Sequence, residues 1–463
     1  MSIEYRHNTS SQLDILYHLQ NVSSAFVHDL SNRVDVKEYS QKLFSMAERE
    51  EAWSGDNLIG LVAYYINHDT QKAFITNVSV DIRFQKQGIA TKLLKNAKCV
   101  AIEERMKLIS LEAANDDELI AFYLHNGFSL HKRVMDSNSE LIMHLVPIVV
   151  IRCTVYNHEP YLRDCLEGFV MQQTNFPFVA IVHDDASTDN SAAIIREYEE
   201  KYPNIIKPIY ETENQYSKQD GSLGRIMNAA IEATGAKYVA MCEGDDYWID
   251  ARKLQKQVDF MEANPECGLV FTNHECDKNG VVFNVKSLID NITFENLVLA
   301  NTIVTCSVLY RRDMYITLVS DFLAIIRVNK LLMGDYPLWL LFAEKSQIKK
   351  IDCVSARYRL LEESASHSKN KRKSYRFDKS TLQCKKIFYE RLRKRNDIRS
   401  IYQVIFYEME FHARKRMLFD YGYIAFDQIF YLLKLLPLYP IIIYRSIRRK
   451  LVRENREYRE NIS

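Results

Sequence analysis

The chain has 463 residues with 61 Lys and Arg, 60 Asp and Glu and a formal net charge of +1, and this length predicts about three domains. Its nine cysteines show no CxxC spacing, and the first 14 residues lack the apolar core of a secretory signal. These features argue against a disulfide-rich secreted protein and predict a cytoplasmic one.

The first candidate site follows an expected strand over residues 73–80. The next run contains QKQGIA, and a helical pattern of apolar residues then covers 91–104. Backbone N–H groups at such a helix start form a cradle for a pyrophosphate, and Gly88 lets the backbone approach the phosphates closely. Lys86 and Lys92 add positive charge.

A second block lies at residues 108–128 and contains Glu112, Asn115 and the run AFYLHNGF. QKQGIA and N-x5-AFYLHNGF, in this order, resemble the GNAT family of acetyl-CoA-dependent N-acetyltransferases, and the resemblance covers roughly residues 3–145. It implies an α/β fold that uses acetyl-CoA. Glu112 is a candidate general base, with a water molecule as the alternative.

The same resemblance assigns roles to individual residues. It implies that Tyr123 protonates the departing thiolate; the alternative is a half-buried aromatic side chain that packs beside Phe122. The implied cofactor-binding residues are Val78 and Val80 for pantetheine, Gln85, Lys86, Gln87, Gly88, Ile89 and Ala90 for the pyrophosphate, and Asn115.

Two further apolar runs, at residues 149–155 and 178–182, each end in a polar turn and precede a helical pattern. The second turn is rich in Asp, Ser and Thr and can cap the helix expected over 192–201. A repeat of strand, polar turn and helix predicts a parallel sheet whose ligand site lies at the carboxyl ends of the strands.

A third strand pattern ends in the acidic run of VAMCEGDDYW, residues 239–248. Glu243, Asp245 and Asp246 repel one another unless a cation lies between them. Oxygen ligands favour Mg²⁺ or Mn²⁺ over zinc. The alternative is an acidic, solvated turn.

These blocks, together with TVYNHEPYL, VHDDASTDNS, TENQ and GDYPLWL, resemble the family 2 glycosyltransferases of GT-A fold from about Pro147 to Ser368. The resemblance implies a nucleotide-sugar donor, and Glu243, Asp245 and Asp246 at the metal-binding position. Glu243 departs from the usual Asp, which puts its direct contact with the metal in doubt. The implied nucleotide-sugar-binding residues are Thr154, Tyr156, Asn157, Glu159, Asp184, Asp185, Arg225 and Asn228.

The same resemblance gives Asp335 the role of the base that deprotonates the acceptor hydroxyl, in a single displacement with inversion. The alternative for Asp335 is a charge that stabilises the start of a helix. Tyr358, Arg359 and His367 fall where the family has a loop that closes over the diphosphate, and residues 301–307 fall on the acceptor side.

The third expected region, residues 369–463, is basic. Residues 364–463 hold 24 Lys and Arg against 10 Asp and Glu, which leaves 37 against 50 in residues 1–363. Within it, residues 424–444 are apolar and aromatic but contain two prolines, so an interfacial segment on an anionic membrane leaflet fits better than a membrane span. A helical subdomain packed on the transferase core is the alternative. No recognition motif supports nucleic-acid binding.

The sequence therefore predicts a GNAT α/β domain at 1–145, a Rossmann-like GT-A domain with a mixed sheet at 147–368, and a basic helical region at 369–463. The predicted function is bifunctional: acetylation of an amino sugar by acetyl-CoA, and transfer of a sugar to a glycan or lipid-linked acceptor of a surface polysaccharide. In one alternative the first domain is a non-catalytic binding module. In another it acetylates the acceptor glycan or a protein amine.

Overall fold

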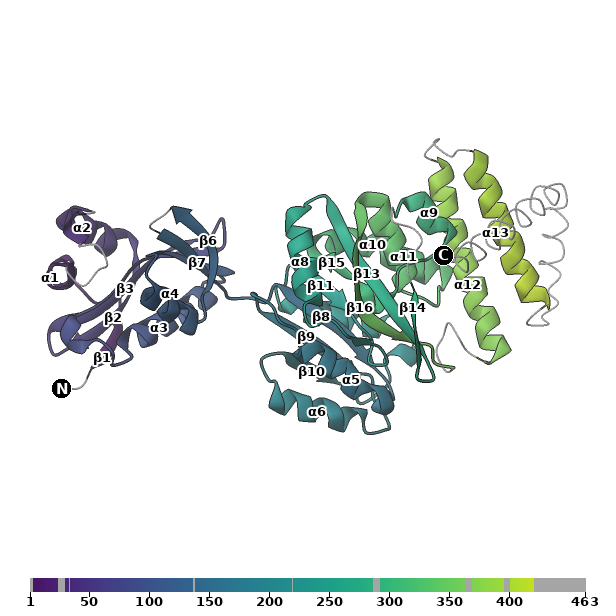
Figure 1. Ribbon diagram of the computed structural model, residues 1–463, viewed down its shortest axis with the longest axis horizontal. Coiled ribbons are helices and arrows are strands. Elements are labelled where there is room, and N and C mark those ends of the chain that lie inside the picture. Colours follow the sequence, from purple (N-terminus) through teal and green to yellow (C-terminus); the bar gives the residue numbers. More distant parts are fainter. Residues whose placement is uncertain are drawn as a thin grey trace, which may run out of the picture. The chain divides into compact units, whose positions relative to one another are not determined.

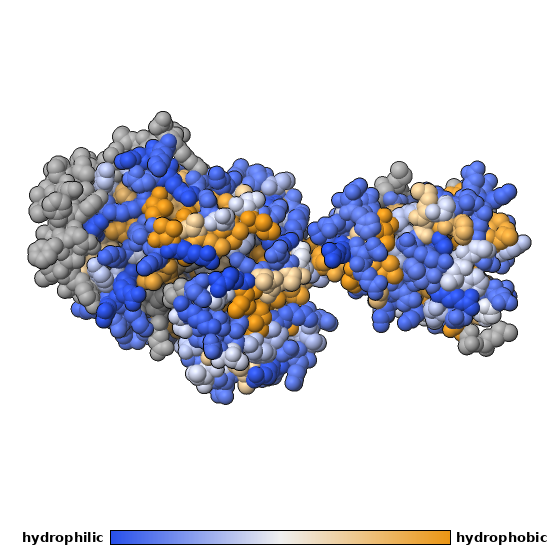
Figure 2. All heavy atoms as spheres, turned by 180° about the vertical axis from the view of Figure 1, so that it is seen from behind, coloured by the Kyte–Doolittle hydropathy of each residue, from blue (hydrophilic) through white to orange (hydrophobic). Residues whose placement is uncertain are grey.

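The structure is a computed structural model that describes residues 3–23, 30–32, 34–135, 138–218, 220–285, 292–362, 369–394 and 400–419. Contacts divide the chain into two compact units, one formed by residues 1–148 with 175–178 and the other by 149–174 with 179–463. Apolar groups are scattered over a largely hydrophilic surface on the face shown in Figure 2.

The first unit is built on a seven-stranded sheet of order β1-β2-β3-β4-β5-β7-β6, in which only β4 and β5 pair in parallel among the described strands (Figure 1). Its elements are β1 Glu4–His7, α1 Gln12–Val22, η2 Leu30–Asn32, α2 Val36–Met46, β2 Glu48–Ser54, β3 Asn57–Asn67, β4 Lys72–Val80, η3 Ile82–Phe84, α3 Ile89–Glu103, β5 Leu108–Ala114, α4 Asp117–His125, β6 Ser129–Met135 and β7 Asn138–His144.

Both faces of this sheet are buried, as the alternation along β3 shows. Leu61 and Ala63 pack with residues of α1 and α2, whereas Val62 and Tyr64 pack with residues of α3. A polar residue fixes the start of α1, α2 and α4: Ser11 forms a capping box with α1, and the side chains of Asp35 and Asp116 accept backbone N–H bonds from α2 and α4.

The second unit is built on a nine-stranded mixed sheet whose main path is β10-β9-β8-β11-β15-β13-β16-β12, with β14 paired to β13. Its elements are β8 Val149–Val155, α5 Glu159–Val170, β9 Phe178–Asp184, α6 Ser191–Lys201, β10 Ile206–Tyr210, η4 Tyr216–Lys218, α7 Ser222–Ala233, β11 Tyr238–Met241, β12 Tyr247–Trp248, α8 Lys253–Ala263, β13 Cys267–Lys278, β14 Val281–Val285, α9 Phe294–Leu299, η5 Thr305–Ser307, β15 Leu309–Arg311, α10 Arg312–Asn329, α11 Asp335–Lys345, β16 Gln347–Arg359, α12 Lys371–Lys394 and α13 Ser400–Phe419.

Parallel pairing is what brings the polar turns of this unit to one edge. β10 runs parallel to β9, and β11 runs parallel to β8, whereas β15 is antiparallel to both β11 and β13. The turns after β8 and β11 therefore lie at the same end of the sheet.

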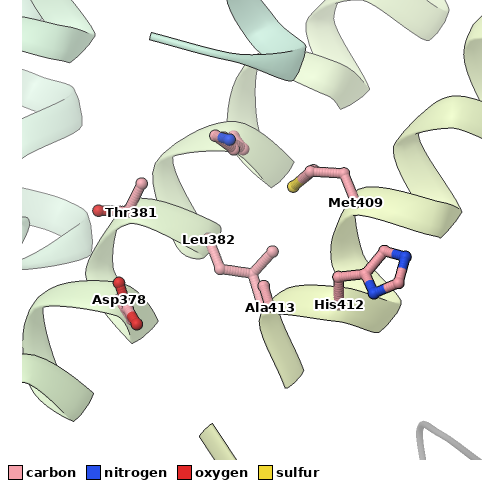
Figure 3. Close-up of a pocket in the computed structure, with 7 residues that line it drawn as sticks. Asp378, Thr381, Leu382, Met409, His412 and Ala413 are labelled. Carbon is pink, nitrogen blue, oxygen red and sulfur yellow. The ribbon is translucent and has the colours of Figure 1, made fainter. Parts of the chain in front are cut away.

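The described part of the basic C-terminal region packs on the core of this unit. Phe388 and Phe406 belong to the same buried cluster as Trp339, and the rings of Tyr389 and Phe406 stack with their centroids 3.8 Å apart. Between α12 and α13 lies a pocket of about 310 Å³ (Figure 3), and no residue predicted for a site lines it.

The apolar segment 424–444 and the arginines after it lie outside the described residues, as does His367. No helix in the part of the chain that the structure describes has the length and apolar content needed to cross a membrane.

Candidate active sites

The first unit has a cavity of about 460 Å³ beside β4, the start of α3 and α4. Its lining contains most of the residues predicted to bind the cofactor, whereas Gln87 and Asn115 are not among them. The side-chain oxygen of Asn115 instead accepts a hydrogen bond from Ser139. The predicted residues that line the cavity are Val78, Val80, Gln85, Lys86, Gly88, Ile89, Ala90 and Tyr123.

This cavity exists because β4 leaves β5. Among the described residues, β4 pairs with β5 only over Lys72–Ile75, and an irregularity in the β3–β4 ladder follows at Thr76. The Tyr39 hydroxyl donates to the Thr76 carbonyl at 2.9 Å. The part of β4 beyond Ile75 thus borders a gap that β5 does not fill, and Val78 and Val80 line the cavity there.

The start of α3 closes one end of the cavity. Gly88 precedes the helix with φ +77°, a left-handed conformation that favours glycine, and as the residue before the helix it has no side chain to cap the first helical N–H groups. The Gln85 side chain donates to the Val80 carbonyl at 3.1 Å and ties this loop to β4. These free N–H groups fit a pyrophosphate, so the residues present suit acetyl-CoA.

The position of Tyr123 agrees with both predicted roles, the proton donor and the packed aromatic side chain. Its ring packs edge-on against Phe122 and Phe128, and only 6% of the residue is exposed, yet it lines the cavity. Burial raises the pKa of Tyr123, so its hydroxyl keeps its proton and can donate it. Glu112 is exposed on β5.

In the second unit, the turns after β8 and β9 are fastened to each other. The Asn157 side chain accepts from the Thr188 N–H at 2.7 Å, and the Glu159 carboxylate accepts from the side chain of Asn190 at 2.6 Å. Asn157 and Glu159, which were predicted to contact the nucleotide, therefore have structural partners. Tyr156 is 46% exposed beside them, and Thr154 accepts the Gly244 N–H through its carbonyl.

The two aspartates after β9 differ in what they bind. Asp185 accepts the N–H groups of Gln215 and Tyr216 at 2.6 and 3.0 Å and so holds the loop after β10. Asp184 is equally buried, but its Oδ1 finds no hydrogen-bond partner among the described residues. Of the pair, Asp184 has the acceptor capacity left for a ligand.

Arg225 and Asn228 lie on α7, and each already has partners. Arg225 donates to the Asp220 carbonyl and the Ser222 hydroxyl, both at 2.9 Å. The Asn228 side chain accepts from the Tyr315 hydroxyl on α10 at 3.1 Å. That Arg225 and Asn228 lie near the nucleotide-sugar substrate stays a prediction.

The acidic turn after β11 depends on Gly244. A Cβ there would lie 2.8 Å from His158 Nδ1 and 2.9 Å from a Val155 methyl group, so a larger residue would push the turn away from β8. Asp246 is 4% exposed and accepts the Arg359 N–H at 2.9 Å. Burial, followed by the charges of Asp245 and Glu243, raises the pKa of Asp246 well above its usual range.

Glu243 is exposed at this edge of the sheet. Loss of hydration around its carboxylate, followed by the charge of Asp245, raises the pKa of Glu243 to about 7, and the charge of Asp335 adds to the rise. The positive charge of Arg152 acts in the opposite direction. The structure therefore brings Glu243 and Asp335, which are far apart in the sequence, close enough for their charges to interact.

Asp335 is the first residue of α11, and both of its carboxylate oxygens have donors. Oδ1 accepts the Tyr336 N–H at 2.7 Å, and Oδ2 accepts the Thr305 hydroxyl at 3.1 Å. Burial raises the pKa of Asp335, and these two hydrogen bonds counteract the rise. A carboxylate with a raised pKa that still ionises is suited to accept a proton.

Within the described residues, no group of three or more His, Cys, Asp and Glu side chains is arranged to hold a metal ion by itself. Mg²⁺ is commonly held by one or two carboxylates together with substrate phosphates. One or two of Glu243, Asp245 and Asp246 can serve in that mode, because they offer oxygen ligands at the end of one strand.

Three residues that support this site were missed or only partly predicted from the sequence: Arg152, Thr305 and Arg359. Arg152 interrupts the apolar run of β8, and a charge within a buried strand was a usable signal. Thr305 gave no signal of its own within the expected acceptor side. Arg359 donates to the Asp245 carbonyl at 2.9 Å and lies over the Tyr247 ring, so it holds the acidic turn.

Comparison with known proteins assigns each unit to a family. Residues 13–128 match the Acetyltransferase (GNAT) family, and residues 150–318 match Glycosyl transferase family 2. Both resemblances predicted from the motifs are confirmed, as is the fold class of a GNAT domain followed by a GT-A domain with a mixed sheet. The C-terminal region is helical where the structure describes it, in α12 and α13.

Individual relatives cover only parts of the chain. It is 37% identical over 164 residues to an uncharacterized protein of Mycobacterium tuberculosis, which covers 34% of this chain and 45% of that protein. It is 31% identical over 113 residues to a poly(ribitol-phosphate) beta-glucosyltransferase of Bacillus spizizenii, covering 24% and 16%. The chain thus spans less than half the length of these relatives. The solved structure of S. aureus TarS in complex with UDP matches with a TM-score of 0.38 and 16% identity over 58% of this chain and 71% of that chain.

The raised pKa of Asp246 predicts how metal-free protein responds to pH. Because the folded state holds this proton more tightly than the unfolded state, the stabilisation is complete below the unfolded pKa of about 3.9 and is lost as the pH rises through the folded pKa. Asp246→Asn keeps the acceptor for Arg359 without the charge. In EDTA at pH 8 the variant should therefore have a melting temperature a few degrees above that of the parent, because each kcal/mol of stability shifts the melting temperature by roughly 2–4 °C.

At pH 4 the two proteins should melt together, which serves as the internal control. Mg²⁺ or Mn²⁺ at pH 8 should narrow the difference by stabilising the parent. An Asn variant that is less stable than the metal-free parent at pH 8 would contradict this account of the acidic turn.

Proposed function

We propose that this chain, which joins a GNAT domain to a family 2 glycosyltransferase domain, is a bifunctional enzyme of surface polysaccharide synthesis. The first domain uses acetyl-CoA to acetylate an amino sugar, in nucleotide-linked form. The second transfers a sugar from a nucleotide-sugar donor to a glycan or lipid-linked acceptor, with a divalent cation and inversion at the anomeric carbon. The observation that carries the proposal is the meeting of the acidic turn after β11 with Asp335 at one edge of the sheet.

In the glycosyl transfer, the carboxylates have different roles. When bound, Mg²⁺ or Mn²⁺ supplies positive charge that stabilises the departing nucleoside diphosphate. Glu243, Asp245 and Asp246 would hold the ion, and Asp184 offers its free oxygen to the nucleotide. Asp335, held by Thr305, accepts the proton of the acceptor hydroxyl. Because the base and the leaving group then lie on opposite sides of the sugar, the displacement inverts the anomeric centre.

The acetyl transfer takes place in the first unit. The cavity beside β4 accommodates the pantetheine chain, with the pyrophosphate at the start of α3. The amine attacks the thioester carbonyl, the bond from carbon to sulfur breaks, and the Tyr123 hydroxyl protonates the thiolate. Glu112 or a water molecule accepts the proton of the amine.

The two activities have a common substrate class if the acetylated amino sugar becomes the transferred sugar. A fused chain raises the local concentration of the intermediate. The relative from Bacillus spizizenii, which acts on poly(ribitol-phosphate), supports a role in surface polysaccharide synthesis. A non-catalytic GNAT domain, and acetylation of an acceptor glycan or a protein amine, are the competing functions.

Asp335→Asn should lower kcat of sugar transfer by about 10²- to 10⁴-fold and leave donor binding near the parent's, because only the proton acceptor is removed. Asp313→Asn is the matched control. Asp313 stands at the start of α10 and makes the same bond to the next N–H, at 2.7 Å in both cases. Equal losses of activity in both variants would reduce Asp335 to a charge that stabilises a helix.

A panel of nucleotide amino sugars with acetyl-CoA tests the first domain, with mass spectrometry of the products. We expect one panel member to gain an acetyl group. Tyr123→Phe should slow this reaction by about tenfold or more without weakening acetyl-CoA binding, because the ring packing is kept. A protein that does not bind acetyl-CoA by calorimetry, but still transfers sugar, would leave the non-catalytic domain as the answer.

Flotation with anionic vesicles tests contact with the cytoplasmic membrane surface. Because residues 424–444 are apolar and several arginines follow them, we expect the full chain to float and a chain ending at residue 419 to stay at the bottom. Neutral vesicles control for binding without charge. Equal flotation of both chains would contradict this proposal.

A further inference from the structure

A lysine is completely buried next to the acidic turn. Lys253, the first residue of α8, has no exposed surface, and burial lowers its pKa to about 8. Burying an ammonium group costs several kcal/mol unless its contacts compensate, and an apolar residue of similar volume is often the more stable choice. This lysine therefore calls for a role beyond filling space.

The contacts of Lys253 lead to one short turn. Its Nζ donates to Gln257 Oε1 at 2.7 Å and lies 4.2 Å from the centre of the Trp248 ring. Gln257 in turn donates to the Ser307 carbonyl at 2.8 Å, and the Trp248 indole donates to the Cys306 carbonyl at 2.8 Å. Both neighbours of the lysine thus hold the backbone of η5.

The side chains of the same turn reach two of the site's carboxylates. Thr305 donates to Asp335 at 3.1 Å. Burial, followed by the charge of Asp246, raises the pKa of the Cys306 thiol, so this thiol and the Asp246 carboxylate are close enough to interact. Residues 305–307 also contact β11, β13 and β16, so the turn lies among the strands that form the site. A shift of η5 would move the partners of both carboxylates together.

We infer that Lys253 and Gln257 are positioning residues that fix η5, and through Thr305 and Cys306 set the base Asp335 against the metal-binding residue Asp246. The inference rests on the proposed glycosyl transfer. Lys253 orients Gln257 so that its amide nitrogen points at the Ser307 carbonyl, and the cation holds the Trp248 ring in the plane that reaches Cys306. Neither residue touches the substrate, so their effect passes entirely through the turn.

Lys253→Met, which removes the charge at similar length, tests this inference. We expect kcat of sugar transfer to fall on the order of 10- to 100-fold while KM for the donor stays near the parent's, because small displacements of reacting groups have effects of this size. Hydrogen exchange of residues 302–310 should accelerate, a measurement that needs no substrate. Combined with Thr305→Val, Lys253→Met should lower kcat by less than the product of the two separate fold-changes, because both act in part through the contact between Thr305 and Asp335.

Gln255→Leu is the matched control, since Gln255 is also buried on α8 and donates to Asp259 at 2.8 Å, four residues along. It should leave kcat and the exchange of residues 302–310 unchanged. If Lys253→Met does not fold, Gln257→Leu takes its place. Unchanged kcat, unchanged exchange, or losses that add to those of Thr305→Val would each overturn the inference. A parent without any transfer activity would overturn the proposed function instead, and exchange alone would then decide whether Lys253 holds η5.

Discussion

Repulsion among carboxylates at the carboxyl end of β11 is the constraint around which the second unit is arranged. Glu243, Asp245, Asp246 and Asp335 approach one another there, and residues of β8 and β16 limit the cost of this repulsion. Arg152 supplies positive charge from β8, the backbone of Arg359 donates to Asp246, and the guanidinium of Arg359 holds the turn through the Asp245 carbonyl. These contacts lessen the repulsion but leave Glu243 and Asp246 with raised pKa values. A cation among them would relieve the rest.

The local parts of this arrangement could be predicted from the sequence because they depend on neighbouring residues. An apolar strand that ends in EGDD places three carboxylates at one sheet edge once the strands are parallel, and a lone Asp before PLWLLF falls at a helix start. Long-range contacts could not be read in this way. Thr305 and Asp335 meet across 30 residues, and Asn157 meets Thr188 across 31. Asn157 and Glu159 look like ligands by type and position, yet in the fold they fasten one turn to the next.

In the first unit, too, local features could be predicted from the sequence, whereas long-range contacts could not. A glycine before a helix predicted a left-handed turn at the helix start, because φ is a local property, and Gly88 does adopt this conformation. The gap between β4 and β5 was not visible, since it arises from an irregularity in strand pairing and a bond from Tyr39 to the Thr76 carbonyl. His18 adds a further hidden support: its ring contacts the Leu58 carbonyl at 2.9 Å and the Ser79 hydroxyl at 2.8 Å. Burial lowers the pKa of His18 to about 4, so this ring stays neutral and acts as a fixed link between α1 and β4.

The ionisation of Asp335 and the ionisation of Glu243 oppose each other. The ionised Asp335 raises the pKa of Glu243, and by reciprocity an ionised Glu243 opposes the ionisation of Asp335. Positive charge bound at Glu243 would cancel this opposition. The hydrogen bonds from Thr305 and the Tyr336 N–H already favour the ionised form of Asp335. A cation held there together with the diphosphate of a donor would add to these hydrogen bonds and further favour the form of Asp335 that accepts a proton.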